Sequence, residues 1–185
     1  MKRSAVLVVG LSLACGGGDV SSVQAPLPGN PPMNPVPIST TTSSAPAAVF
    51  DPAAYPTGER NEYAVACASG NEEGCYNLAI MLDEGEEGAV DDAGARALYE
   101  RVCKAGVTDG CHNLALMLED GEGGGTDVAR AREIYTANCD KGDGDSCFNA
   151  AILYNEGKGG PTDTTKGAAM QKRSCDLGVA EACGN

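Results

Sequence analysis

Tryptophan is absent from this chain of 185 residues, which holds one histidine, His112, and two phenylalanines. The chain therefore has few aromatic residues that could line a ligand pocket, and metal sites that need several imidazoles are excluded. No apolar run reaches the roughly 18 residues of a transmembrane helix. Basic residues are also few. The chain has 13 Lys and Arg against 26 Asp and Glu, and its formal net charge is -13. That balance disfavours nucleic acids and anionic lipid headgroups as partners.

The N-terminus has the composition of a secretion signal. Lys2 and Arg3 precede an apolar stretch over residues 5–14, which is too short to span a bilayer. The stretch ends in Leu-Ala-Cys15-Gly, which resembles a bacterial lipoprotein processing site, although Ser12 stands where leucine is most common. The resemblance implies a signal peptide over 1–14 and a lipid on Cys15. An ordinary cleaved signal with a stray or intermolecular thiol is the alternative.

Residues 15–54 have the composition of a tether. The segment is rich in proline, serine and threonine and nearly lacks large apolar side chains. It cannot bury enough surface to offset the entropy of ordering, and its prolines favour extended polyproline II conformations. We therefore predict a disordered tether that holds a folded region, 55–185, away from a membrane.

Eight of the nine cysteines recur with a period of 36 residues, as pairs whose members are 8 residues apart. The pairs are Cys67 with Cys75, Cys103 with Cys111, Cys139 with Cys147, and Cys175 with Cys183. The same period relates Tyr63, Tyr99 and Tyr135; Asn77, Asn113 and Asn149; and Asp91, Asp127 and Asp163. This internal repeat divides the folded region into copies 55–90, 91–126 and 127–162 and a partial copy 163–185.

Each copy has the pattern of two helices. In the second copy Asp91 is a good N-cap, and Gly106 and Gly121 are predicted to end the two helices. Apolar or small residues recur at helical spacing on one face, at Ala95, Leu98, Tyr99, Val102 and Cys103, and then at Cys111, Leu114, Ala115 and Leu118. Neither helix can bury its apolar face alone, so we predict an all-α solenoid of stacked helix hairpins. In the partial copy, polar Gln171 and Ser174 indicate a polar cap.

The cysteine spacing supports a hairpin within each copy. Eight residues along one helix would separate two Cα atoms by about 12 Å, whereas a disulfide needs them within about 7 Å. The chain must therefore turn back between the two cysteines, and a glycine lies at the turn in every copy. Local pairing is the simplest connectivity, because it gives every copy the same solution. Zinc ligation is the alternative, but zinc pairs usually lie two to four residues apart.

These features resemble the Sel1-like repeat family, and within it a cysteine-rich, secreted bacterial branch. The resemblance covers 56–185 and rests on the 36-residue hairpin, the cysteine spacing, and the sequences 76–79 (Tyr-Asn-Leu-Ala) and 112–115 (His-Asn-Leu-Ala). It implies a tetratricopeptide-like solenoid that mediates protein–protein contacts, often in the envelope. Some cysteine-rich members carry the label "beta-lactamase". Binding of beta-lactams or cell-wall fragments, with slow beta-lactamase-like turnover, is therefore the alternative function.

No catalytic constellation emerges from the sequence. No lysine has a serine three positions before it, as serine beta-lactamases require, and His112 has no second histidine to share a metal. We therefore expect no catalytic residue, cofactor or metal. The acidic loops between copies are interpreted as a solvated edge, since none matches an EF-hand.

Basic residues gather on the first helices of the second and third copies, despite the acidic composition. We interpret this polar face as the partner-binding surface, and the resemblance implies that it lines a concave side. A salt-bridged solvent face is the alternative. The candidates are Arg96, Glu100, Lys104, Arg132 and Thr136, with Arg101, Arg130 and Asp140 beside them. The predicted function is a non-catalytic lipoprotein scaffold that binds envelope proteins, with Gly16 after Cys15 favouring the outer membrane.

Overall fold

A computed structural model describes residues 52–184. Every described residue belongs to one compact unit. The predicted signal peptide, the lipid attachment at Cys15 and nearly all of the tether lie outside the described residues. Within 52–184, no helix is both long and apolar enough to cross a membrane.

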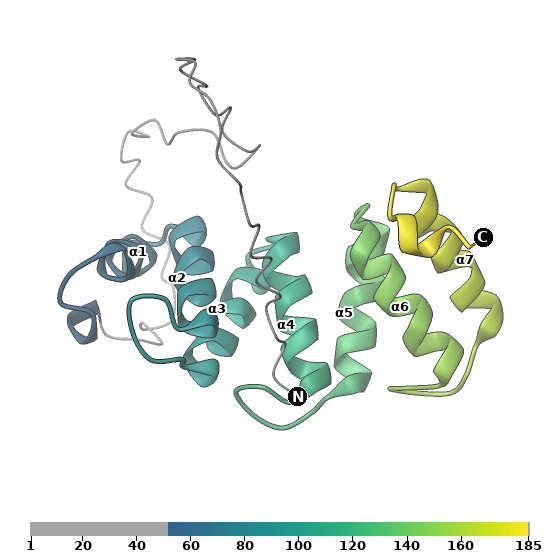
Figure 1. The fold of residues 1–185 in the computed structure, drawn as a ribbon, viewed down its shortest axis with the longest axis horizontal. Coiled ribbons are helices and arrows are strands. Elements are labelled where there is room, and N and C mark those ends of the chain that lie inside the picture. Colours follow the sequence, from purple (N-terminus) through teal and green to yellow (C-terminus); the bar gives the residue numbers. More distant parts are fainter. Residues whose placement is uncertain (1–51, 185) are drawn as a thin grey trace, which may run out of the picture. The chain divides into compact units, whose positions relative to one another are not determined.

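The described residues form seven α-helices and two short 3-10 helices, with no strand among them. Each α-helix packs against the next along the chain (Figure 1). The α-helices are α1 (Glu59–Ala68), α2 (Glu72–Glu84), α3 (Asp92–Lys104), α4 (Thr108–Asp120), α5 (Val128–Asp140), α6 (Gly144–Glu156) and α7 (Thr164–Asp176). The 3-10 helices are η1 (Pro52–Ala54) and η2 (Ala180–Ala182). The all-α prediction is confirmed.

The helices begin and end where the repeat predicts. Asp91 and Asp163 each accept a hydrogen bond, 2.9 Å long, from the backbone N–H three residues later, and they cap α3 and α7. Asp127 caps α5 in the same way. Gly121 ends α4 with a φ of 81°, a left-handed conformation that costs glycine little because it has no Cβ.

One apolar core runs through the stacked helices. Tyr99 and Tyr135 are 1% and 0% exposed, so the core role predicted for these tyrosines is confirmed. Tyr63, at the same repeat position in α1, is partly buried against the core. Leucines and alanines fill most of the remaining space, which suits close approach between helices.

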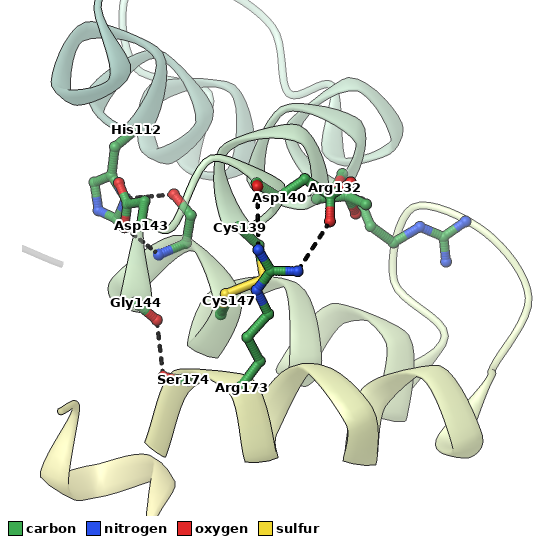
Figure 2. The surroundings of a disulfide bond; sticks show 11 residues. His112, Arg132, Cys139, Asp140, Asp143, Gly144, Cys147, Arg173 and Ser174 are labelled. Carbon is green, nitrogen blue, oxygen red and sulfur yellow. Dashed lines mark hydrogen bonds and ion pairs between the residues drawn. A yellow bond between two sulfur atoms is a disulfide. The ribbon is translucent and has the colours of Figure 1, made fainter. Parts of the chain in front are cut away.

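All four cysteine pairs form the predicted disulfides within their copies. The Cα–Cα distances run from 4.4 Å for Cys67–Cys75 to 4.8 Å for Cys175–Cys183. The first three bonds each join the end of an odd-numbered helix to the first turn of the next helix, as Figure 2 shows for Cys139–Cys147, and the fourth joins the end of α7 to Cys183, just after η2. The hairpin assignment is therefore correct.

The two ends of the repeat region differ from the prediction. Pro52–Ala54, assigned to the tether, form η1, because the Asn61 side-chain amide on α1 donates to the carbonyls of Pro52 and Tyr55. At the other end, η2 stands in place of a full second helix, as the partial copy 163–185 predicts. Ser174, interpreted as part of a polar cap, is instead fully buried, and its hydroxyl donates to Gly144 O at 2.8 Å.

Candidate functional site

The structure places the five candidate partner-binding residues on α3 and α5. Lys104 is exposed, with 73% of its side chain accessible, but Arg96, Glu100, Arg132 and Thr136 are half-buried. Each of the four half-buried residues forms a hydrogen bond or ion pair within the chain. Of the five candidates, only Lys104 is therefore exposed, and the other four are held by contacts within the chain.

Arg96 and Arg132 hold the connections that leave the even-numbered helices of their own copies. Arg96 Nη1 donates to the carbonyls of Glu122 and Gly125, at 3.2 and 3.0 Å. Arg132 Nη1 donates to Pro161 O at 3.2 Å. These long side chains donate to backbone carbonyls of the loops that follow α4 and α6.

A third arginine of this set was missed in the sequence. Arg60 precedes Arg96 by the same 36 residues and is 6% exposed. Its guanidinium donates to Met81 O at 2.7 Å and to Ala89 O at 3.3 Å. The signal was available, because the repeat register aligns Arg60 with the other two.

Glu100 lies at the centre of an ion-pair network on this face. Its Oε1 is 3.0 Å from Lys104 Nζ and 3.1 Å from Arg130 Nη2. Hydrogen bonds from Lys104, the largest favourable contribution, and from Arg130 hold the pKa of Glu100 below its usual value. The neighbouring candidates Arg101 and Asp140 are also paired, Arg101 with Glu72 at 3.0 Å and Asp140 with Arg173 at 3.5 Å (Figure 2).

The third copy has a different arrangement around Tyr154 on α6. The Arg132 guanidinium carbon and Lys166 Nζ lie 4.6 and 4.4 Å from the centroid of the Tyr154 ring. Lys166 Nζ donates to the Tyr154 hydroxyl at 2.7 Å, and Thr136 Oγ1 is 3.5 Å from the same oxygen. Burial raises the pKa of Tyr154, but the hydrogen bonds and the two cations outweigh it and lower that pKa. The cluster is a half-buried cationic site in an acidic chain.

Half-buried carboxylates mark the acidic edge of the repeats. Asp83 and Glu119, 36 residues apart, are hydrogen-bonded to Tyr99 and Tyr135 respectively. Burial is the largest cause that raises the pKa of each carboxyl, and neighbouring acidic side chains raise it further. The carboxyls at these positions therefore bind protons more readily than exposed ones do.

Asn113 also has a role different from the one predicted. At this position in the first turn of a second helix, the sequence predicts a hydrogen bond to the backbone of a neighbouring copy. Instead, Asn113 is hydrogen-bonded to the side chains of Tyr76 and Tyr99, whose ring centroids are 6.1 Å apart. Its role is structural, since it joins the first and second copies through two partly or fully buried phenols.

His112, Ser146 and Asp143 form a cluster that lacks the geometry of a catalytic triad. His112 Nδ1 is 3.0 Å from Ser146 Oγ and 3.9 Å from Asp143 Oδ2, so serine and aspartate approach the same ring nitrogen. A relay needs them on opposite nitrogens. Ser146 is also 0% exposed, and Asp143 caps α6 by accepting from Ser146 N at 2.8 Å. The cluster, part of which appears in Figure 2, is a contact between α4 and α6.

No metal-binding group emerges from the acidic residues, the cysteines or His112. Within residues 52–184, no three or more His, Cys, Asp or Glu side chains are grouped closely enough to hold a metal ion. The paired cysteines are held in disulfides.

The hairpin stack, its 36-residue period and its glycine-bounded helices define a helical-repeat protein. The profile of the Sel1 repeat matches three consecutive segments, 72–107, 108–143 and 144–179. The chain therefore belongs to the Sel1 repeat family, whose members generally act as protein-interaction scaffolds. These segments have the predicted period but begin at the even-numbered helices, half a copy out of phase with our division. No curated protein matches the chain.

Solved structures that share the fold include the following three. A protective antigen of uropathogenic Escherichia coli with an SLR fold, c5321, gives a TM-score of 0.64 at 23% identity over 66% of this chain. A Sel1 repeat protein from Oxalobacter formigenes gives 0.60 at 20% over 67%. Helicobacter pylori cysteine rich protein B gives 0.54 at 20% over 67%. The matches cover 26%, 52% and 94% of those chains, so this chain spans well under two thirds of the first two.

Proposed function

We propose that this protein is a non-catalytic scaffold of the bacterial envelope, anchored by a lipid on Cys15, whose repeats bind other envelope proteins. The Sel1 repeats over 72–179 are the observation that carries the scaffold role. The four disulfides favour an oxidising compartment outside the cytoplasm. The apolar stretch and the Ala-Cys-Gly junction support the lipid, with the outer membrane as its destination.

The polar face of α3 and α5 remains the proposed partner-binding surface. Internal bonds hold Arg96 and Arg132 in fixed positions, which lowers the entropy that a partner must remove on binding. Exposed Glu133, Ala137 and Asp140 follow one another at helical spacing beside Thr136. A partner on this face would contact fixed charges and small side chains rather than a large apolar patch.

Photo-crosslinking in living cells tests the scaffold role directly. A crosslinking amino acid placed at Ala137 on α5 is expected to capture a small set of discrete envelope proteins. The matched control is the same amino acid at Asp109, an exposed position in the first turn of α4. Identical products from both positions, or none from Ala137, would contradict the proposed surface.

The catalytic alternative has its own assay. Labelled penicillin is expected neither to acylate the purified protein nor to be hydrolysed by it. Ser146, the serine nearest to a histidine, is buried and has the wrong geometry. Stoichiometric labelling or measurable turnover would show that the non-catalytic assignment is wrong.

A further inference from the structure

The second and third copies differ at one position that decides the charge balance of this face. Glu100 in the second copy is replaced by Thr136 in the third. In the second copy the Glu100 carboxylate pairs with Arg130, the first-turn cation of the following odd-numbered helix. In the third copy the equivalent cation is Lys166, and the carboxylate that would pair with it is absent.

Lys166 and Arg132 consequently have no carboxylate partner. None of the ion pairs within residues 52–184 includes either of them. Both are half-buried, so each has given up part of its hydration without an opposite charge in contact. Acidic residues outnumber basic ones two to one in this chain, which makes two adjacent unpaired cations unexpected.

Tyr154 positions the two cations. The equivalent residues in the preceding copies, Leu82 and Leu118, belong to the apolar core, and only the third copy has a polar aromatic residue there. The ring lies against both cations, and its hydroxyl accepts from Lys166 at 2.7 Å. Cation–ring contacts of this kind stabilise by about 0.5–2 kcal/mol. They keep Lys166 and Arg132 together beside Thr136.

We propose, building on the scaffold role above, that the third copy binds an acidic side chain of a partner polypeptide between Lys166 and Arg132. The partner's carboxylate pairs with Lys166 as the Glu100 carboxylate pairs with Arg130 in the second copy. Charge-assisted hydrogen bonds to Lys166 and to the guanidinium of Arg132 hold it. The net charge of the chain repels polyanions at long range, so the site selects a single carboxylate in an otherwise neutral segment.

The test uses the purified full-length protein in detergent, with carbon-13 in its six tyrosine rings. The probe is a terminally blocked peptide with one glutamate among glycines and serines, and its control has glutamine instead. We expect the glutamate peptide to shift the Tyr154 resonance, assigned with Tyr154→Phe, in a saturable way. The glutamine peptide should bind at least about tenfold more weakly. Equal shifts from both peptides would overturn the proposal.

A pair of substitutions at one residue separates occupancy of the site from loss of fold. Thr136→Glu supplies an internal carboxylate, as Glu100 does, and should reduce glutamate-peptide binding at least about tenfold. Thr136→Ala removes the hydroxyl without adding charge and should bind as the wild type does. If Thr136→Glu does not fold, Lys166→Met gives the same test. Retained binding in whichever of these two variants folds would refute the site.

Two further probes test whether the bound anion is a side-chain carboxylate, a C-terminal carboxylate or a phosphate. A peptide with glutamine and a free C-terminus, and inorganic phosphate, should each bind more weakly than the glutamate peptide. Preference for either would show that the ligand class is wrong. If the glutamate peptide fails to bind while Ala137 still crosslinks discrete proteins, this site is refuted and the scaffold role stands. If the peptide binds but Ala137 captures nothing, the scaffold role fails alone.

Discussion

Ser174 on α7 donates its hydroxyl to Gly144 O at the beginning of α6, and Asn138 on α5 makes the equivalent bond to Thr108 O at the beginning of α4. The two bonds, 2.8 and 2.9 Å long, are one repeat apart. Both side chains are almost fully buried, at 0% and 1% exposed. Each bond fastens one copy to the next, because its donor and acceptor lie on either side of a boundary between copies.

Substitution of Asn138 should destabilise the protein measurably. Asn138→Ala leaves Thr108 O without its donor and opens a small cavity, so we expect a loss of about 2–3 kcal/mol. Ser174→Ala should cost about 1 kcal/mol, since less volume is removed. Denaturant unfolding measures both. The control, Ser69→Ala at an exposed serine, should stay within about 0.5 kcal/mol, and an Asn138 effect of that size would contradict the role of this bond.

Disulfide removal should cost more in the middle of the solenoid than at its end. Each bond closes a loop of 8 residues, which corresponds to about 2.5 kcal/mol in the chain-entropy model. Cys103–Cys111 has neighbouring copies on both sides, whereas Cys175–Cys183 is next to a 3-10 helix and Cys183 is exposed.

The measurement compares the melting temperatures of the two double-serine variants. The central variant should melt lower, and the reverse order would argue against cooperative stacking. Thiol titration of the unreduced Cys15→Ser protein, denatured, should find no free thiol. A free thiol would mean that the pairing is incomplete.

Two of the loop-holding arginines, Arg60 and Arg96, should rank by burial. Arg60→Ala is expected to cost about 2–3 kcal/mol, because it removes a nearly buried charged donor that bonds Met81 O and Ala89 O. Arg96→Ala, half-exposed, should cost about 1 kcal/mol. Exposed Lys104→Ala on the same helix as Arg96 serves as the control. Thermal unfolding that places all three variants within about 0.5 kcal/mol of wild type would mean that the loops are not held by these contacts.

Stability should rise on mild acidification because of Asp83. Its pKa is raised by burial, then by the charges of Glu122, Asp92 and Glu84, so the folded state binds the proton more tightly than the unfolded state. Stability is therefore lost as pH rises from the ordinary aspartate pKa through the raised one. Asp83→Asn should increase the melting temperature at pH 7 and flatten this dependence.

Glu86→Gln, which removes one charge from the exposed connection after α2, is the matched control for Asp83. It should leave the slope of stability against pH unchanged. An identical flattening in both variants would assign the effect to net charge rather than to the burial of Asp83.

The repeat register explains both the successes and the failures of the sequence-based prediction. Cys103 with Cys111, Asp91 as a cap and Tyr99 in the core follow from local spacing, which fixes the face and the turn. Arg96 was misplaced because its long side chain reaches carbonyls 26 and 29 residues away, a contact that helix periodicity does not reveal. Ser174 was taken for a surface residue because only tertiary packing supplies its acceptor, Gly144 O.

The cationic cluster could have been found from the sequence by a different comparison. When the copies are aligned, Tyr154 stands at the position of Leu82 and Leu118, and Thr136 stands at the position of Glu100. The prediction counts Thr136 only as one of several polar residues on the face of the first helices, and it does not compare Thr136 with Glu100. Departures from the repeat mark the individual function of a copy, whereas the repeated residues mainly determine the fold.

Every loop-holding arginine closes a contact inside its own copy: Arg60 to Ala89, Arg96 to Gly125, and Arg132 to Pro161. The disulfide at the opposite end of each hairpin is equally local. Each of these copies is therefore held at both ends by contacts between its own residues. Duplication or loss of 36 codons would change the length of the solenoid by one complete unit and leave no arginine or cysteine of this set without its partner.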